Sequence, residues 1–153
     1  MPPRMTRETP AGVPDEVLRC STVRYLVHHV RRSPGVDVAA LSRYVATYGT
    51  GGDCVTFAIR VPGADVPALE NRVMRVGTAW DCHQFARWVA GADRNRLDRR
   101  ALSLASADEC RYFACRADRA WSRWFLDRAE EMEARSRKRD GDEEHASRPG
   151  GLS

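Results

Sequence analysis

Five cysteines are the residues of this chain best suited to chemistry, because a thiolate can act as a nucleophile or a metal ligand. They are Cys20, Cys54, Cys82, Cys110 and Cys115, and the middle three are evenly spaced with 27 residues between successive members. No two of them form a Cys-x-x-Cys pair, so the ligand spacing of a zinc or iron–sulfur site is lacking. We therefore expect packed thiols in a reducing compartment, and no metal or other cofactor.

The histidines do not complete a catalytic arrangement with these thiols. His28 and His29 are adjacent, and neighbouring positions on a helix point about 100° apart. Cys82 and His83 are adjacent as well, which does not give a hydrogen bond between nucleophile and base. No Gly-x-Ser-x-Gly, His-Glu-x-x-His or phosphate-loop pattern occurs, so we expect a protein that is not an enzyme.

Length and composition indicate one ordinary globular domain. The chain has 153 residues, of which 42% are hydrophobic, and this excludes collagen-like and wholly disordered classes. All but one of the 25 basic side chains are arginine, Lys138 being the exception, a bias typical of a GC-rich genome. The formal charge of +4 is small and the arginines are spread along the chain, so we expect no nucleic-acid partner.

The sequence shows no sign of a membrane segment or a secretory signal. No apolar run approaches the roughly 18 residues of a membrane helix. Residues 1–10 are polar and lack the hydrophobic stretch of a signal peptide. We expect a soluble, cytoplasmic protein without a membrane anchor of its own.

Apolar residues recur with a helical period through most of the chain. Start signals predict helices that begin near Pro14, Asp37, Asp65, Thr78 and Ser106 and that end at turns, most of which contain glycine. Residues 54–61 are the only strand candidate and have no strand to pair with. The sequence therefore predicts an all-α fold of six to eight helices, and no internal repeat is evident.

This pattern divides the chain into three expected segments. Residues 1–13 are expected to be a disordered lead, and residues 14–133 one helical domain. Residues 134–153 mix charges of both signs without an apolar face, which predicts a charged, disordered tail.

Four tryptophans, Trp80, Trp88, Trp121 and Trp124, gather in the second half of the chain. They suit an aromatic core, and they equally suit a hydrophobic groove that accepts an amphipathic helix.

Two segments resemble motifs of the B-cell lymphoma 2 (Bcl) family of apoptosis regulators. Residues 70–91 resemble its first homology motif, since Gly77 and Trp80 stand at the family's spacing and further aromatic residues follow. Residues 22–35 are similar to its fourth motif, a basic-Tyr-aliphatic helix that ends at a glycine turn. Residues 121–125 are similar to the Trp-rich second motif, and the order of the three segments also matches.

This resemblance implies a Bcl-like helical bundle around a central hydrophobic helix over residues 79–91. It also implies a viral protein, similar to the poxvirus relatives of the family, that inhibits host apoptosis. Such a protein sequesters the amphipathic death-motif helix of host pro-apoptotic proteins in a surface groove, acts in the host cytoplasm, and has no membrane anchor of its own here. A homodimer is left open.

The resemblance also implies which residues would line the groove. The family pairs a signature arginine with an aspartate of the ligand helix, and this chain has Cys82 at that position. Nearby arginines are candidates to replace it. The expected groove residues are Leu41, Tyr44, Tyr48, Phe57, Arg72, Val73, Met74, Arg75, Gly77, Trp80, Phe85, Arg87 and Trp88.

Two alternatives remain at this point. The same fold could inhibit innate inflammatory signalling through a helix face. Alternatively, the chain could be a small DNA-binding regulator in which the helix over residues 38–48, with Ser42 and Arg43, is the recognition helix of a helix-turn-helix motif.

Overall fold

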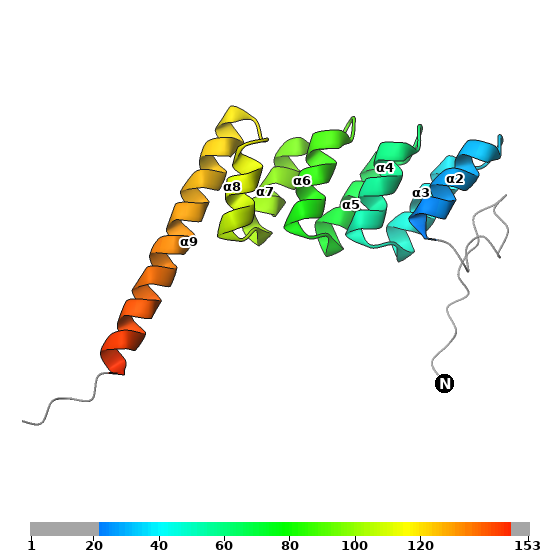
Figure 1. Cartoon of the computed structure of the whole chain (residues 1–153). Helices are drawn as coiled ribbons and strands as arrows, with labels where there is room; N and C mark the ends of the chain where they lie inside the picture. The colour runs from blue at the N-terminus through cyan, green and yellow to red at the C-terminus, as the bar shows by residue number, and fades with distance from the viewer. Residues whose placement is uncertain (1–21, 148–153) are drawn as a thin grey trace, which may run out of the picture. The chain divides into compact units, whose positions relative to one another are not determined.

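The computed structural model describes residues 22–147, and every regular element among them is an α-helix (Figure 1). The prediction of an all-α fold is therefore confirmed for this part of the chain, and the strand candidate over residues 54–61 lies mostly within a helix. The helices are α2 (Val23–Arg32), α3 (Val38–Tyr48), α4 (Gly51–Arg60), α5 (Val66–Val76), α6 (Ala79–Trp88), α7 (Arg94–Leu104), α8 (Ala107–Ala114) and α9 (Arg119–Ala146).

The chain forms two compact units, where the sequence predicted one domain over residues 14–133. The boundary falls between Ala101 and Leu102, inside α7. In the described residues the first unit contains α2 to α6 and most of α7, and the second contains the end of α7 together with α8 and α9. The predicted disordered lead, residues 1–13, and the predicted first helical turn at Pro14 lie outside the described residues.

An aspartate begins one helix in every 28 residues. Asp37, Asp65 and Asp93 are 28 positions apart. Each side chain accepts a hydrogen bond from the backbone N–H three residues later, at 3.0, 3.2 and 3.1 Å. This N-cap satisfies one of the backbone donors that a helix start leaves unpaired.

A second helix start recurs with the same period. Thr50, Thr78 and Ser106 are also 28 positions apart, and each is the N-cap of a capping box. Each hydroxyl accepts from the N–H of the acidic residue three positions on, at 3.1 to 3.2 Å. The carboxylate of that residue accepts from the N–H of the cap in return, at 2.9 to 3.0 Å.

The turn between these two helices is repeated as well. Gly35, Gly63 and Gly91 share the 28-residue spacing and have φ values of 89°, 77° and 80°, a region that favours glycine. The described chain up to Phe113 is therefore built from copies of a 28-residue helix–turn–helix unit. The expectation that the sequence contains no internal repeat is wrong.

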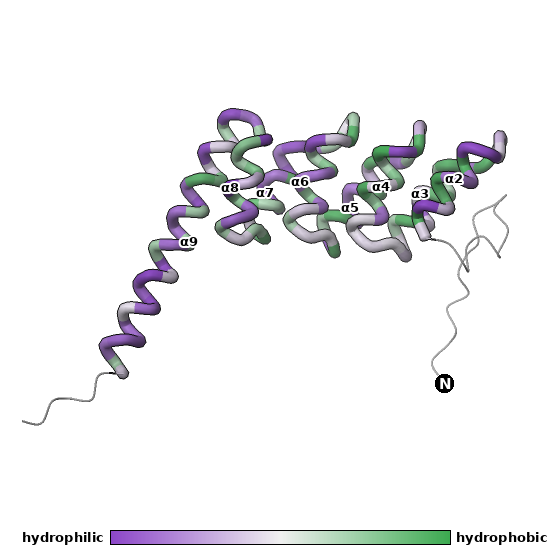
Figure 2. Tube along the Cα trace, in the orientation of Figure 1, coloured by the Kyte–Doolittle hydropathy of each residue, from purple (hydrophilic) through white to green (hydrophobic). Residues whose placement is uncertain are grey.

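The buried positions follow the same register. Three residue types recur at the same places in successive copies, and all of these side chains are fully buried: Leu41, Leu69 and Leu97; Cys54, Cys82 and Cys110; and Phe57, Phe85 and Phe113. In the first unit, α3 contacts α5, α2 contacts α4, and α4 contacts α6 in turn, so that successive copies stack in two layers of helices. Figure 2 shows apolar and polar segments alternating along these helices. Such a stack buries the apolar stripe of each copy against its neighbours.

The second unit is built from α8 and α9. The rings of Phe113 and Phe125 meet edge to face, with 5.6 Å between centroids, and Arg111 forms an ion pair with Glu133. Beyond this contact α9 continues to Ala146, and residues 134–146 are exposed. This stretch was predicted to be disordered, and the structure instead makes it helical. Its arginine, glutamate and alanine residues favour helix, and opposite charges four positions apart support it.

The structure does not confirm a Bcl-like arrangement around a central helix. The predicted central segment, residues 79–91, corresponds to α6, which packs on α4 and α5 as a member of the stack. Its two tryptophans, Trp80 and Trp88, are 43% and 59% exposed. Among the described residues, no helix combines the length and apolar character that crossing a membrane would need.

Replacing Gly63 by alanine should lower the free energy of unfolding by about 1 kcal/mol, because a Cβ atom disfavours the left-handed backbone of the repeated turn. Gly141→Ala is the matched control, since Gly141 lies inside α9 with open space around the added carbon. Urea denaturation followed by circular dichroism measures both. Equal losses in the two variants would contradict this account of the turn.

Candidate functional site

The repeated cysteines belong to the core and are poor nucleophiles. Cys54, Cys82 and Cys110 are fully buried free thiols. Burial raises the pKa of Cys54 to about 12 and that of Cys82 to about 11, although Arg72 and Arg100 respectively oppose the rise. Protonated thiols at neutral pH neither attack a substrate nor bind a metal readily.

No group of three potential ligands among residues 22–147 could hold a metal ion. Cys115 is the exposed cysteine of the described part, and Cys20 lies outside it. His83 is buried beside Cys82, and its ring lies 6.4 Å from that of Trp80. The clearest candidates for function in the described part are therefore surfaces.

Four of the predicted groove residues lie in the core instead. Leu41, Phe57, Val73 and Phe85 are all fully buried. They stand at three repeated positions: Phe57 and Phe85 are 28 residues apart, Val73 occupies the place of Val45 in the next copy, and Leu41 has its counterpart in Leu69. Because each one packs between stacked copies, none of them lines an open groove in this structure.

The predicted residues on α3 and α5 have other surroundings. Tyr44 and Tyr48 lie side by side with ring centroids 4.9 Å apart. Arg72 donates from Nε to the carbonyl oxygen of Gly49 at 3.0 Å, so it ties α5 to the end of α3. Met74 is half-buried, Arg75 is exposed, and Gly77 ends α5 by donating its N–H to the Val73 carbonyl at 2.8 Å.

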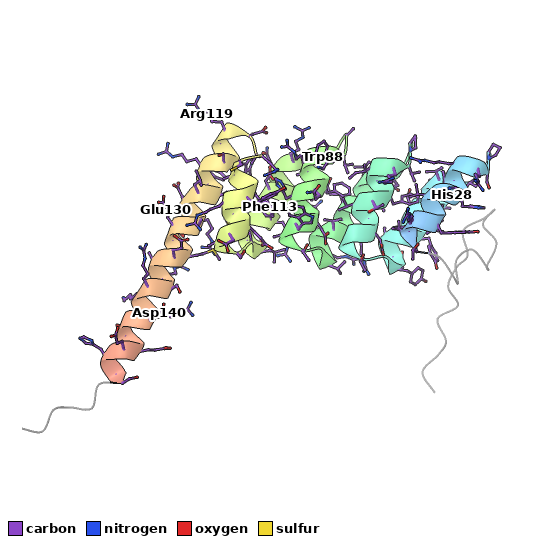
Figure 3. The ribbon with its side chains drawn as sticks, in the orientation of Figure 1. His28, Trp88, Phe113, Arg119, Glu130 and Asp140 are labelled. Atoms are coloured by element: carbon purple, nitrogen blue, oxygen red, sulfur yellow. The ribbon has the colours of Figure 1, made fainter. Side chains whose placement is uncertain are left out.

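The remaining three predicted residues, Trp80, Arg87 and Trp88, are exposed on α6. The Arg87 guanidinium lies 5.3 Å from the centre of the Trp88 ring, a cation–π arrangement. Trp88 is labelled in Figure 3 at the surface of the first unit. An indole that is 59% exposed is a large apolar contact surface left to solvent.

The described part of the first unit contains more arginines than acidic residues, and most of its carboxylates are used as helix caps. Residues 22–101 contain twelve arginines and seven acidic residues. Five of the acids are the helix caps described above. Of the other two, Glu70 accepts from the N–H of Asp93 at 2.9 Å and pairs with Arg96 at 3.5 Å, and Asp98 is buried. The carboxylates therefore accept hydrogen bonds from backbone N–H groups or lie in the core, whereas most of the arginines are exposed to solvent.

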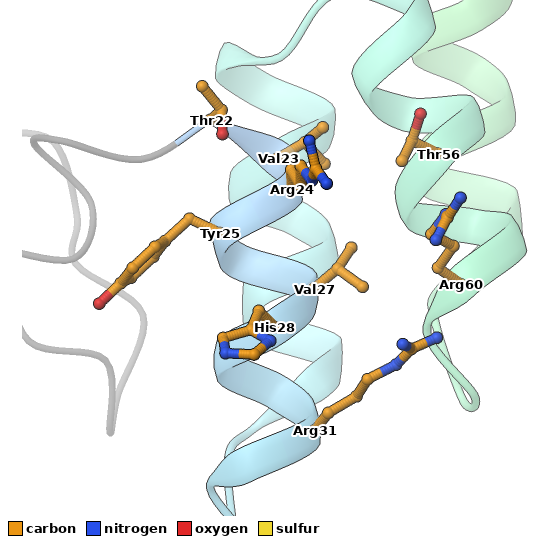
Figure 4. Close-up of a pocket in the computed structure, with 9 residues that line it drawn as sticks. All are labelled: Thr22, Val23, Arg24, Tyr25, Val27, His28, Arg31, Thr56 and Arg60. Carbon is orange, nitrogen blue, oxygen red and sulfur yellow. The ribbon is translucent and has the colours of Figure 1, made fainter.

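A hollow of about 860 Å³ lies between α2 and α4 in this basic unit (Figure 4). Arg24 and Arg31 extend from α2 toward α4, and Arg60 lies on the facing side of α4. No hydrogen bond or ion pair joins these three guanidinium groups to any other described residue. No acidic residue is among the described residues that line it, which are Thr22, Val23, Arg24, Tyr25, Val27, His28, Arg31, Thr56 and Arg60. We call it the α2–α4 hollow.

None of the residues predicted from the sequence lines the α2–α4 hollow. The signal that could have found it is local charge, since residues 22–36 contain three arginines and no carboxylate. The overall net charge conceals this imbalance, because residues 102–147 contain more acidic than basic side chains.

Comparison of the chain with protein-family models, with characterised proteins and with solved structures gives no match.

Phe85→Ala should lower the free energy of unfolding by about 3 kcal/mol or more, because it empties a fully buried site between stacked helices. Trp88→Ala should cost less than about 1 kcal/mol, because most of that indole already faces solvent. Urea denaturation of both variants tests the placement of the two side chains. A small loss for Phe85→Ala would show that this ring lines an open groove after all.

Proposed function

We propose that this chain is a non-enzymatic, helical-repeat binding module that holds a segment of another protein across the solvent faces of α2, α4 and α6. The observation that carries the proposal is the contrast between a repeated frame and an unrepeated surface. Helix caps, turn glycines and core residues recur every 28 positions. A frame of this kind presents side chains in fixed relative positions.

The solvent-facing positions of the same helices differ from copy to copy. Arg24 on α2 corresponds to Gly52 on α4 and to Trp80 on α6. The position of Thr56 on α4 is taken by glutamine on α6 and by histidine on α2. An unrepeated row of side chains suits a partner whose own side chains vary, as those of a polypeptide do, better than a uniform polymer.

Exposed apolar side chains would supply the binding energy. Ile59 on α4 is 46% exposed, and Trp80 and Trp88 on α6 are exposed to a similar extent or more. Tryptophan and arginine are the residue types that most often dominate the energy of protein interfaces. Arg87 beside Trp88 adds a charge to the same patch.

The predicted capture of a pro-apoptotic helix is a narrower case of this proposal, and its inflammatory-signalling alternative is another. The burial of Leu41, Phe57 and Phe85 weighs against the first, because these residues are among those expected to line the groove. The burial of Ser42 weighs against the helix-turn-helix alternative, because Ser42 belongs to the expected recognition helix and would have to be accessible to DNA. Ser42 is fully buried, where it donates to the Val38 carbonyl at 2.7 Å and accepts from the Asp65 N–H.

Selection of a phage-displayed library of random 16-residue peptides against the full chain tests the proposal. We expect a set of enriched peptides that share a sequence pattern. Trp88→Ala should weaken their binding at least about tenfold, because an exposed indole of this kind is a typical interface anchor. Trp124→Ala on α9 is the matched control, since that indole is 51% exposed in the second unit, and it should leave the affinity unchanged.

Two results would contradict the proposal. One is the absence of any enriched peptide. The other is enriched peptides whose binding is equally sensitive to both tryptophan substitutions, because the binding surface would then not be that of α2, α4 and α6.

A further inference from the structure

We infer that the α2–α4 hollow is an oxyanion site that takes a doubly charged phosphate group carried by a phosphorylated side chain of the bound protein segment. This inference rests on the proposed function, because it names the chemistry of the partner at the same surface. It starts from three cations that share one hollow and receive no counter-charge from any described residue: Arg24, Arg31 and Arg60.

Such an arrangement is unusual for a surface of ordinary composition. Among the described residues, no carboxylate lines the hollow. Like charges that share a concave site repel one another, and a bound anion removes that repulsion. The hollow therefore has the electrostatics of a site prepared for an anion.

A favourable interaction with the helix dipole accounts for the positions of two of the three arginines but not for the third. Arg31 and Arg60 lie in the last turns of α2 and α4, where a cation is favourable. Arg24 lies in the first turn of α2, where a cation is unfavourable, and that turn contains no acidic side chain. In the other copies this position is Gly52, Trp80 or Asp108, so a positive charge here is particular to the hollow.

The donors present suit a phosphate better than a carboxylate. Guanidinium groups bind phosphate oxygens in pairs of parallel hydrogen bonds, and three of them offer more donors than one carboxylate can use. Thr56 adds a hydroxyl group and His28 an imidazole. A phosphate monoester carries a charge of about −1.5 to −2 at pH 7 and three acceptor oxygens, so it neutralises more of the site.

The position of the hollow connects it to the rest of the surface. Arg60 is the last residue of α4, and its counterpart one repeat later is Trp88, the last residue of α6. Because α4 contacts α6, a segment anchored by its phosphate beside Arg60 can continue toward the exposed indole of Trp88. Phosphate recognition by an arginine cluster is a recurring mode of peptide binding.

Titration of the full-length, isotope-labelled chain, followed by amide shifts in NMR spectra, tests the inference. The probes are inorganic phosphate and three pentapeptides, Gly-Gly-X-Gly-Gly, in which X is phosphoserine, serine or glutamate, all at equal ionic strength. We expect saturable shifts confined to residues 22–31 and 56–60. The phosphoserine peptide should bind more tightly than inorganic phosphate and at least about tenfold more tightly than the glutamate peptide.

Charge-neutral variants assign the site. Arg31→Gln should weaken binding of the phosphoserine peptide about tenfold or more, because it removes a charge-assisted hydrogen bond. Arg43→Gln, at an exposed position on α3, is the matched control and should bind as the unmodified chain does. Equal losses in both variants, or shifts spread over all arginines, would overturn the inference.

The other outcomes are equally decisive. Glutamate and phosphoserine peptides of equal affinity would make the site one for carboxylates, and equal affinity for inorganic phosphate would make it one for the free ion; either result overturns the inference. If library peptides bind and no phosphate probe does, this inference fails and the proposed function stands. If inorganic phosphate binds while neither the library peptides nor the phosphoserine peptide do, the proposed function fails and this inference fails with it.

Discussion

The same hydrogen bond, from a backbone N–H at a helix start to a buried side chain, recurs at two junctions between successive copies of the repeat. The backbone N–H of Asp65 donates to Ser42 Oγ at 3.0 Å, and one repeat later the N–H of Asp93 donates to Glu70 Oε2 at 2.9 Å. Both acceptors are buried side chains on the second helix of the preceding copy, α3 or α5. Packing a helix start against a neighbour takes its N–H groups away from water, so the stack depends on these acceptors.

The same use of polar groups explains the charge of the surface. Because carboxylates are taken up as caps and buried acceptors in residues 22–101, they cannot neutralise the arginines outside. Arg24, Arg31 and Arg60, which have no hydrogen bond or ion pair to another described residue, surround the α2–α4 hollow. The frame that orders the helices therefore also produces the basic face that we assign to binding. The nearly balanced total charge had concealed this separation.

Local signals predicted the helices well and the higher organisation poorly. The starts at Asp37, Asp65, Thr78 and Ser106 were predictable because each cap satisfies its own helix within four residues. The even spacing of three cysteines does not by itself reveal the repeat, because evenly spaced thiols are equally compatible with metal ligands. Residues 22–35 and 78–91, assigned to two Bcl motifs, are copies of one unit two periods apart. Burial of Phe57 and Phe85 depends on stacking between copies, which no single segment reveals.

Native-state hydrogen exchange of the Asp65 and Asp93 amides, measured by NMR on the full chain, tests the repeated frame most directly. Both residues are helix caps outside the helices proper, and their N–H groups are held by side chains of the preceding copy. The account predicts that both amides exchange as slowly as amides of the helix interiors. Exchange at the rate of an unstructured peptide would contradict it, because the copies would then not be joined by these hydrogen bonds.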